Sequence, residues 1–200
     1  MTQSKSKRTA FGVLFACCCL QFAANGICMG TAGTYMTYVA EAMGTPLSAI
    51  SLYITVQGIV TMLTVPMIGR LMNTSMRRWV ATLAMLAEVV GYTLLGVWDS
   101  PMGFYVSGAI IGLGGACITY TAVPLFVNSW FKTNVGTYLG IAVVWPGVAQ
   151  MIFQPMVTNL CVSVGYQNTY FIMGAVAFVI GVIPAAIFLR NDPAQYQIEA

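Results

Sequence analysis

Long stretches without any charged residue dominate this chain of 200 residues. Four uninterrupted stretches, and a fifth that Glu88 alone interrupts, cover residues 9–40, 42–69, 100–131, 133–189 and 79–98. Each is long enough for a helix that crosses a bilayer, which takes about 20 mainly apolar residues. The stretch 133–189 is too long for one crossing, and its polar segment 165–168 offers a place to turn. The pattern therefore predicts six transmembrane helices, near residues 11–38, 49–69, 79–98, 103–127, 136–159 and 168–189.

The predicted fold is an all-α, polytopic membrane protein with both termini in the cytoplasm. The expected segments are a cytoplasmic tail at 1–10, a bundle at 11–189 and the start of a cytoplasmic linker or tail at 190–200. Within the bundle, residues 11–98 and 103–189 are expected to form two repeats of three helices each.

Composition excludes a soluble domain, and the basic residues predict the orientation. Only 6% of the residues are charged and 58% are hydrophobic, whereas soluble domains carry about 25% charged residues. Short loops rich in Lys and Arg stay in the cytoplasm. The basic residues all fall on one predicted face: Lys5, Lys7, Arg8, Arg70, Arg77, Arg78, Lys132 and Arg190. The net charge of +3 thus reflects topology at the membrane surface, and no nucleic-acid partner is predicted.

One segment of the chain repeats within it. QGIVTMLTVPM at 57–67 matches PGVAQMIFQPM at 146–156 without a gap, so that Gly58, Met62, Pro66 and Met67 align with identical residues. The shift carries the first three predicted helices onto the last three, and three crossings reverse the direction of the second copy. The match predicts an inverted 3+3 repeat. The alternative is that two helices share a Gly and Pro kink motif by chance.

Glycine and proline are abundant inside the predicted helices. Glycines let membrane helices approach closely, which predicts packing contacts at Gly112, Gly114, Gly115, Gly136 and Gly140. Proline removes a helical hydrogen bond, which predicts bends at Pro66, Pro124, Pro146, Pro155 and Pro184.

The residue types needed for common chemistry are missing. The chain has no His, which removes Ser-His catalysis and His-ligated metal, and we predict that it is not an enzyme and has no catalytic residue, metal or cofactor. The consecutive residues Cys17, Cys18 and Cys19 point about 100° apart on a helix, so they do not converge on one ligand.

The loop between the second and third predicted helices resembles that of the major facilitator superfamily, Gly-x-x-x-Asp-Arg-x-Gly-Arg-Arg. The matching positions are Gly69, Arg70, Asn73, Arg77 and Arg78. The family's acidic residue is replaced by Asn73, so the latch that this acid forms between two transporter halves is expected to be weak or absent. Alternatively, the arginines only set topology.

A second set of residues resembles the monocarboxylate and oxalate/formate porter branch of that superfamily. It comprises Asn128, Ser129, Trp130, Phe131, Gly136, Gly140, Pro146, Gly147 and Pro155. The resemblance implies the amino-terminal six-helix half of a secondary transporter in a plasma membrane, the inner membrane in a bacterium. The partners that it implies are the lipid bilayer, a small solute, a coupling proton, and either a second six-helix half or another copy. The solute would be an organic anion, either a monocarboxylate or a dicarboxylate, and symport and antiport both stay open.

In the family, the first, second, fourth and fifth helices face the transport pathway. The polar residues there are the pathway candidates: Gln21, Asn25, Gln57, Tyr120, Gln150 and Gln154. The alternative role for each is a hydrogen bond between helices. Glu88, in the third predicted helix, is either a coupling residue or a protonated acid bonded to a neighbouring helix.

Two other functions compete with transport. A six-helix channel of the aquaporin type also has an inverted repeat, but its Asn-Pro-Ala motifs are absent. The other is a non-transporting half, because the chain ends where the central loop of a transporter begins, which suggests a fragment or a split gene product.

Overall fold

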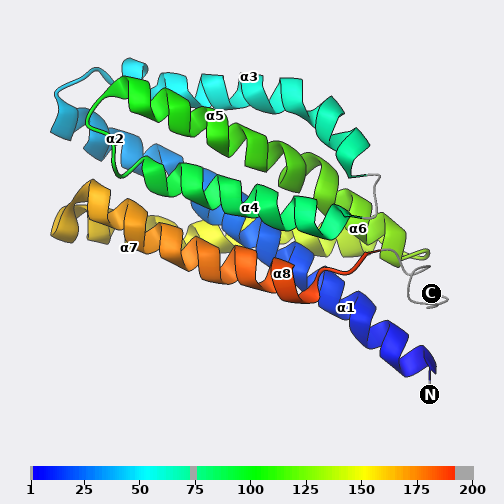
Figure 1. The fold of residues 1–200 in the computed structure, drawn as a ribbon. Helices are drawn as coiled ribbons and strands as arrows, with labels where there is room; N and C mark the ends of the chain where they lie inside the picture. Colours follow the sequence, from blue (N-terminus) through cyan, green and yellow to red (C-terminus); the bar gives the residue numbers. More distant parts are fainter. Residues whose placement is uncertain (1, 73–75, 192–200) are drawn as a thin grey trace.

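The computed structural model describes residues 2–72 and 76–191, and these residues form helices and short connections without any β-strand. Figure 1 shows long helices lying side by side, with the start of α1 and the end of α8 toward the same end of the bundle. The elements are α1 (Thr2–Gln21), η1 (Phe22–Met29), α2 (Ala32–Met43), α3 (Leu47–Leu71), α4 (Arg77–Leu94), α5 (Pro101–Cys117), η2 (Ile118–Ala122), α6 (Val123–Trp130), α7 (Val135–Ala177), η3 (Phe178–Val182) and α8 (Ile183–Phe188). The segments η1, η2 and η3 are π-helical.

The helices are long and apolar enough to cross a membrane. Among the described residues, four helical runs meet this condition: Arg8–Met43, Leu47–Leu71, Pro101–Trp130 and Val135–Phe188. Helix α4 is shorter, at 18 residues, and contains Arg77, Arg78 and Glu88. The all-α, membrane-spanning fold agrees with the sequence pattern, whereas the count of six crossings stays a prediction.

The run Val135–Phe188 folds back on itself at Gly165. This residue has φ 83°, a left-handed conformation that glycine adopts without steric cost. Aromatic contacts show that the two parts of this run lie along the first helices in opposite directions. Before Gly165, Phe153 contacts Phe22. After it, Tyr170 stacks on Tyr35 and Phe188 contacts Phe15. The predicted turn at 165–168 is therefore confirmed at its first residue.

The first predicted helix, 11–38, was too short at both ends. Helical structure begins at Thr2 and extends to Met43, with a break only at residues 30 and 31. Gly44 ends α2 in a left-handed conformation and donates its N–H to the carbonyls of Ala40 and Glu41. A hydropathy pattern stops at the first charged residue, whereas the helix continues until its last carbonyls are capped.

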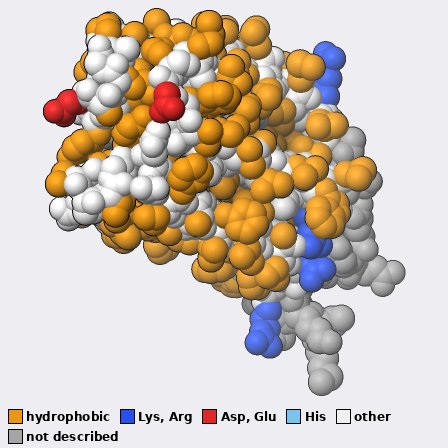
Figure 2. Space-filling view, turned by 60° about the vertical axis from the view of Figure 1, so that its left-hand side comes forward, with side chains coloured by type: hydrophobic (Ala, Val, Ile, Leu, Met, Phe, Trp, Pro, Cys, Tyr) orange, Lys and Arg blue, Asp and Glu red, His pale blue; other side chains and the backbone are white. Residues whose placement is uncertain are grey.

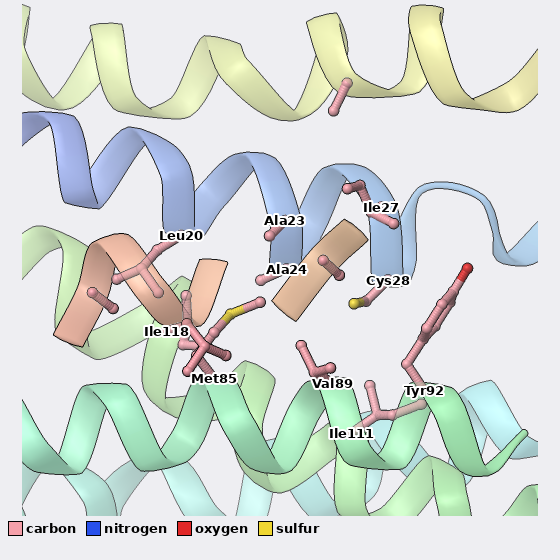
Figure 3. Packing of buried hydrophobic residues seen from close by; sticks show 14 of the residues in the cluster. Leu20, Ala23, Ala24, Ile27, Cys28, Met85, Val89, Tyr92, Ile111 and Ile118 are labelled. Carbon is pink, nitrogen blue, oxygen red and sulfur yellow. The ribbon is translucent and has the colours of Figure 1, made fainter. Parts of the chain in front are cut away.

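The core surrounds α1 and η1. In the apolar segment of Arg8–Met43, 67% is buried inside the structure, whereas in the apolar segment of α3 only 17% is buried. Helix α3 therefore lies at the edge of the bundle. Figure 3 shows residues of α1 and η1 packed against α4, α5 and η2, among them Leu20, Ala23, Ala24, Ile27, Met85, Val89, Ile111 and Ile118.

The glycine predictions are partly confirmed. A Cβ on Gly112 would lie 2.6 Å from the carbonyl oxygen of Gln57, and one on Gly114 would lie 2.6 Å from the carbonyl oxygen of Ala84. These glycines hold α5 between α3 and α4, as Figure 1 shows. The predictions for Gly115, Gly136 and Gly140 were wrong, because a Cβ at any of them would meet no atom within 4 Å.

Proline distorts the helices at two of the five predicted positions. The π-helical segments η2 and η3 end immediately before Val123–Pro124 and Ile183–Pro184, where proline supplies no N–H donor. The other three prolines, Pro66, Pro146 and Pro155, lie inside α3 and α7, and the only residue of α7 with non-helical angles is Gly165.

Charged side chains separate to opposite ends of the molecule. Figure 2 shows acidic side chains at one end of the visible face and basic side chains at the other. In the part of the chain that the structure describes, the exposed acids are Glu41 and Asp99, and Asp99 accepts a 2.9 Å hydrogen bond from the amide of Gln167. This separation agrees with the predicted placement of basic residues on one face, and the orientation of that face stays a prediction.

Candidate solute site

A cavity of about 440 Å³ lies where α3 meets the π-helical segments η1 and η2. Helix α3 supplies most of the lining, and η1, α5 and η2 supply the rest. The lining residues are Met29, Ile54, Gln57, Gly58, Thr61, Met62, Val65, Gly115, Thr119 and Tyr120. None of them is charged.

Gln57 lines this cavity with its side chain almost fully buried, at 6% exposed. The close approach of Gly112 to the Gln57 carbonyl draws this turn of α3 against α5. The Gln57 amide makes no hydrogen bond with the residues that the structure describes, and it borders the open space of the cavity. A polar group that is free to bond inside a mainly apolar cavity is the kind of group that orients a ligand.

Gln21 and Asn25 do not line the cavity, and their side chains are hydrogen-bonded to neighbouring residues. The Asn25 amide nitrogen donates to the Gln21 side-chain oxygen and to the Thr119 hydroxyl, the latter at 2.9 Å. The Thr119 hydroxyl lies 3.1 Å from the other amide atom, Oδ1 of Asn25. This group links η1 to η2, so Asn25 makes the interhelical bond that the sequence analysis gave as the alternative.

The remaining pathway candidates fall into two places. Tyr120 lines the cavity and is 62% exposed, which puts it at the open side. Gln150 and Gln154 are on α7, away from the cavity lining, and both lie beside Gly30. The Gln154 amide donates to the Gly30 carbonyl at 3.3 Å, and the Gln150 side chain would meet a Cβ on Gly30.

Glu88 is completely buried in α4, and neither of its carboxyl oxygens has a hydrogen-bond partner among the described residues. The expectation of a bond to a neighbouring helix was therefore wrong. Glu88 packs against the glycine turn of α5, where a Cβ on Gly114 would lie 2.6 Å from the Glu88 Cβ. Because glycine has no side chain, Gly114 presents no side-chain donor to the carboxyl.

One comparison with known proteins shows the family of this chain, and a second finds a distant relative. The sequence profile of the Major Facilitator Superfamily matches residues 15–200. The chain belongs to the major facilitator superfamily. An uncharacterized MFS-type transporter, YcxA of Bacillus subtilis (strain 168), is 26% identical over 94 residues, which are 47% of this chain. The match covers 23% of that relative's length.

Membership in the superfamily confirms the resemblance at that level and makes the chain a multi-pass membrane protein. The monocarboxylate and oxalate/formate branch stays a prediction, as does the assignment to a single half.

The structure describes four of the five residues of the superfamily loop motif. Gly69 and Arg70 are exposed near the end of α3, and Asn73 lies outside the described residues. Arg78 donates from its guanidinium to the Ala186 carbonyl, and its backbone N–H donates to the Asn191 side-chain oxygen at 3.2 Å.

These Arg78 contacts tie the first turn of α4 to the end of α8. A guanidinium near the last carbonyls of a helix also complements the helix dipole. The same side chain lies 5.3 Å from the centre of the Trp79 ring. Arg78 therefore packs within this bundle, in addition to whatever it contributes to topology. Arg77 is half-buried beside it.

Sequence reasoning missed Thr119, Thr61 and Met29, which line the cavity. Threonine and methionine are common in membrane helices and carry no charge, so no local pattern distinguishes these three from packing residues. Thr119 had one available signal, because it precedes Tyr120 and lies five residues before Pro124, where a helix is expected to distort.

Proposed function

We propose that this chain is the amino-terminal six-helix half of a secondary transporter, which moves a small solute by alternating access together with a second six-helix half. The observation that carries the proposal is the α3 cavity, into which the amide of the mostly buried Gln57 is open, in a chain of the major facilitator superfamily. Membership in that superfamily also favours transport over a channel and over an enzyme. The chain would lie in a plasma membrane, the inner membrane in a bacterium.

Six crossings follow if α4 spans the membrane and the run Val135–Phe188 crosses twice. The inverted repeat then pairs α3 with the first part of α7. Two of the aligned pairs have similar surroundings in the two copies: Met62 is 79% exposed and Met151 is 81% exposed, and a Cβ on Gly58 or Gly147 would meet no atom within 4 Å. These similarities support the repeat.

A second bundle would cover the exposed faces of α3 and α7. Thr55 and Gln154 are exposed on these helices, and beyond the bond from the Gln154 amide to the Gly30 carbonyl, lipid tails offer their polar atoms no further hydrogen-bond partner. A second half with polar residues on its facing side would satisfy them better than lipid does. A second copy of this chain would bury the same surfaces, but it would lack the basic residues that the organic-anion branch carries in its other half.

Glu88 is the residue that we propose for a coupling proton. Of the acidic residues that the structure describes, Glu41 and Asp99 are exposed and Glu88 alone lies inside the bundle. An ionisable side chain within a membrane segment is costly and is commonly functional. Solute uptake by the complete transporter should then depend on a proton gradient, and Glu88→Gln should remove that dependence.

Reconstitution tests the transport proposal. The purified chain is placed in liposomes, alone and with a candidate second half, and exchange of radiolabelled monocarboxylates, dicarboxylates and neutral amides of similar size is measured. We expect saturable exchange only when the second half is present, because one half forms only one wall of the pathway. Saturable uptake by a demonstrated monomer would contradict the proposal.

The predicted orientation has its own test. We expect an impermeant maleimide to label Asp99→Cys but not Lys132→Cys in intact cells, because basic loops stay in the cytoplasm. Both positions are exposed, so access across the membrane decides the result. The parent chain is the control, since its described cysteines are buried apart from the half-buried Cys19. Labelling at position 132 alone would show that the orientation is reversed.

A further inference from the structure

We infer that the α3 cavity binds an uncharged part of a small amphipathic solute, and that the amide of Gln57 recognises the hydrogen-bonding group of that part. This inference deepens the proposed function, on which it rests for the idea that the occupant is the transported solute. Binding itself is a property of the cavity and can be measured without transport.

The lining selects against charge. Its main apolar contributions come from Met29, Ile54, Met62 and Val65, and none of the ten lining residues is ionisable at neutral pH. A charged group that moves from water into this mainly apolar cavity needs a partner of opposite charge, which the lining does not supply. Of the two anion classes implied by the porter resemblance, a short dicarboxylate would therefore fit this half poorly.

Gln57 is the free hydrogen-bonding group inside the cavity. The other polar side chains of the lining are already engaged or lie at its edge: Thr61 donates to the Gly112 carbonyl at 3.1 Å, and Thr119 is bonded to Asn25. Tyr120 lies at the open side, with 62% of its surface exposed. An amide both donates and accepts, so it pairs with a carbonyl, a hydroxyl or another amide.

The size of the cavity suits a small organic molecule. A volume of about 440 Å³ falls within the range of roughly 300–1,000 Å³ that is typical of small-molecule sites. A lipid acyl chain could fill the apolar part, but it would leave the Gln57 amide without a partner. The combination of an apolar wall and one buried amide matches a solute with an apolar body and one neutral polar group.

Three probes of nearly the same shape separate the effect of charge: benzamide is neutral, benzoate is an anion and benzamidinium is a cation. The full chain is placed in nanodiscs with ¹³C-methyl methionine, and the methyl signals are followed by NMR during titration. Met29 and Met62 report on the cavity, and Met151 is the control, because it is as exposed as Met62 but does not line the cavity. We expect benzamide to shift Met29 and Met62 in a saturable way, with benzoate and benzamidinium each at least tenfold weaker.

Two amide variants test the role of Gln57. We expect Gln57→Leu to weaken benzamide binding roughly tenfold, because one buried hydrogen bond is lost. Gln167→Leu removes the same group from the loop beside Asp99, outside the cavity lining, and it should leave the affinity unchanged. Equal weakening by both variants would contradict the assignment of Gln57.

The inference is overturned if Met151 shifts together with Met62, which would indicate partition into lipid only, or if benzoate or benzamidinium binds as tightly as benzamide. The absence of any saturable shift also overturns it. Saturable binding of benzamide without exchange in the reconstituted pair would instead sink the transport proposal and leave the binding site standing.

Discussion

Gly114→Ala is expected to lower the free energy of unfolding by about 3 kcal/mol, at the upper end of what overpacking costs in a core. The added Cβ would lie 2.6 Å from the Ala84 carbonyl oxygen and 2.9 Å from the Glu88 backbone nitrogen. These are atoms of the α4 backbone, which a rotamer change cannot move aside. Helix α5 would have to shift away from α4, and the α3 contacts of α5 would loosen with it.

Gly115→Ala is the matched control for that experiment. Its Cβ would meet no atom within 4 Å, and the residue lines the cavity on another side of α5. We expect this variant to unfold within about 0.5–1 kcal/mol of the parent chain, with any change toward higher stability, since alanine favours helix over glycine. Unfolding of both variants in mixed detergent micelles, followed by tryptophan fluorescence, measures the difference. Similar stabilities would show that α4 and α5 do not pack through Gly114.

Glu88→Met is expected to raise the free energy of unfolding by about 1–3 kcal/mol, which is the usual cost of a buried polar group without a partner. Both carboxyl oxygens of Glu88 are buried and unbonded, and methionine fills a similar volume with an adaptable apolar side chain. A gain in stability on removing a charged residue from a core also indicates that the residue is retained for function.

Glu88→Gln removes the ionisable group of residue 88 but keeps a polar side chain, so it separates the effect of charge from that of polarity. Glutamine keeps a polar end in the same unbonded place, so we expect its stability to stay close to that of the parent chain. The same micelle assay measures the three proteins. A loss of stability in Glu88→Met would mean that the carboxyl has a partner in the membrane, such as a lipid headgroup or a second bundle.

The two experiments probe opposite sides of one helix contact. Gly114 and Glu88 pack against each other, so α5 lacks a side chain where α4 carries an acid. At Gly114 itself, α5 therefore offers no side-chain donor to the Glu88 carboxyl.

The sequence alone determined the features that depend on local composition. The apolar runs predicted membrane helices, and the polar segment at 165–168 predicted the reversal that the structure places at Gly165. The loop residues around Arg77 and the glycine and proline pattern indicated the superfamily, which the profile match confirmed. These features can be predicted from hydropathy and spacing because the free-energy cost of placing a segment in lipid is the sum of the costs of its own residues, whatever the rest of the fold does.

Only the tertiary structure decided which side chains meet. Gly114 and Gly115 are neighbours in sequence, yet one is pressed against α4 and the other faces the cavity. Gln57 and Asn25 were equal candidates, but Asn25 is bonded to Thr119, 94 residues away, and Gln57 has no partner among the described residues. The physical reason is the rotation of each helix about its axis. Close packing between distant segments sets that rotation, and a step of one residue turns a side chain by about 100°.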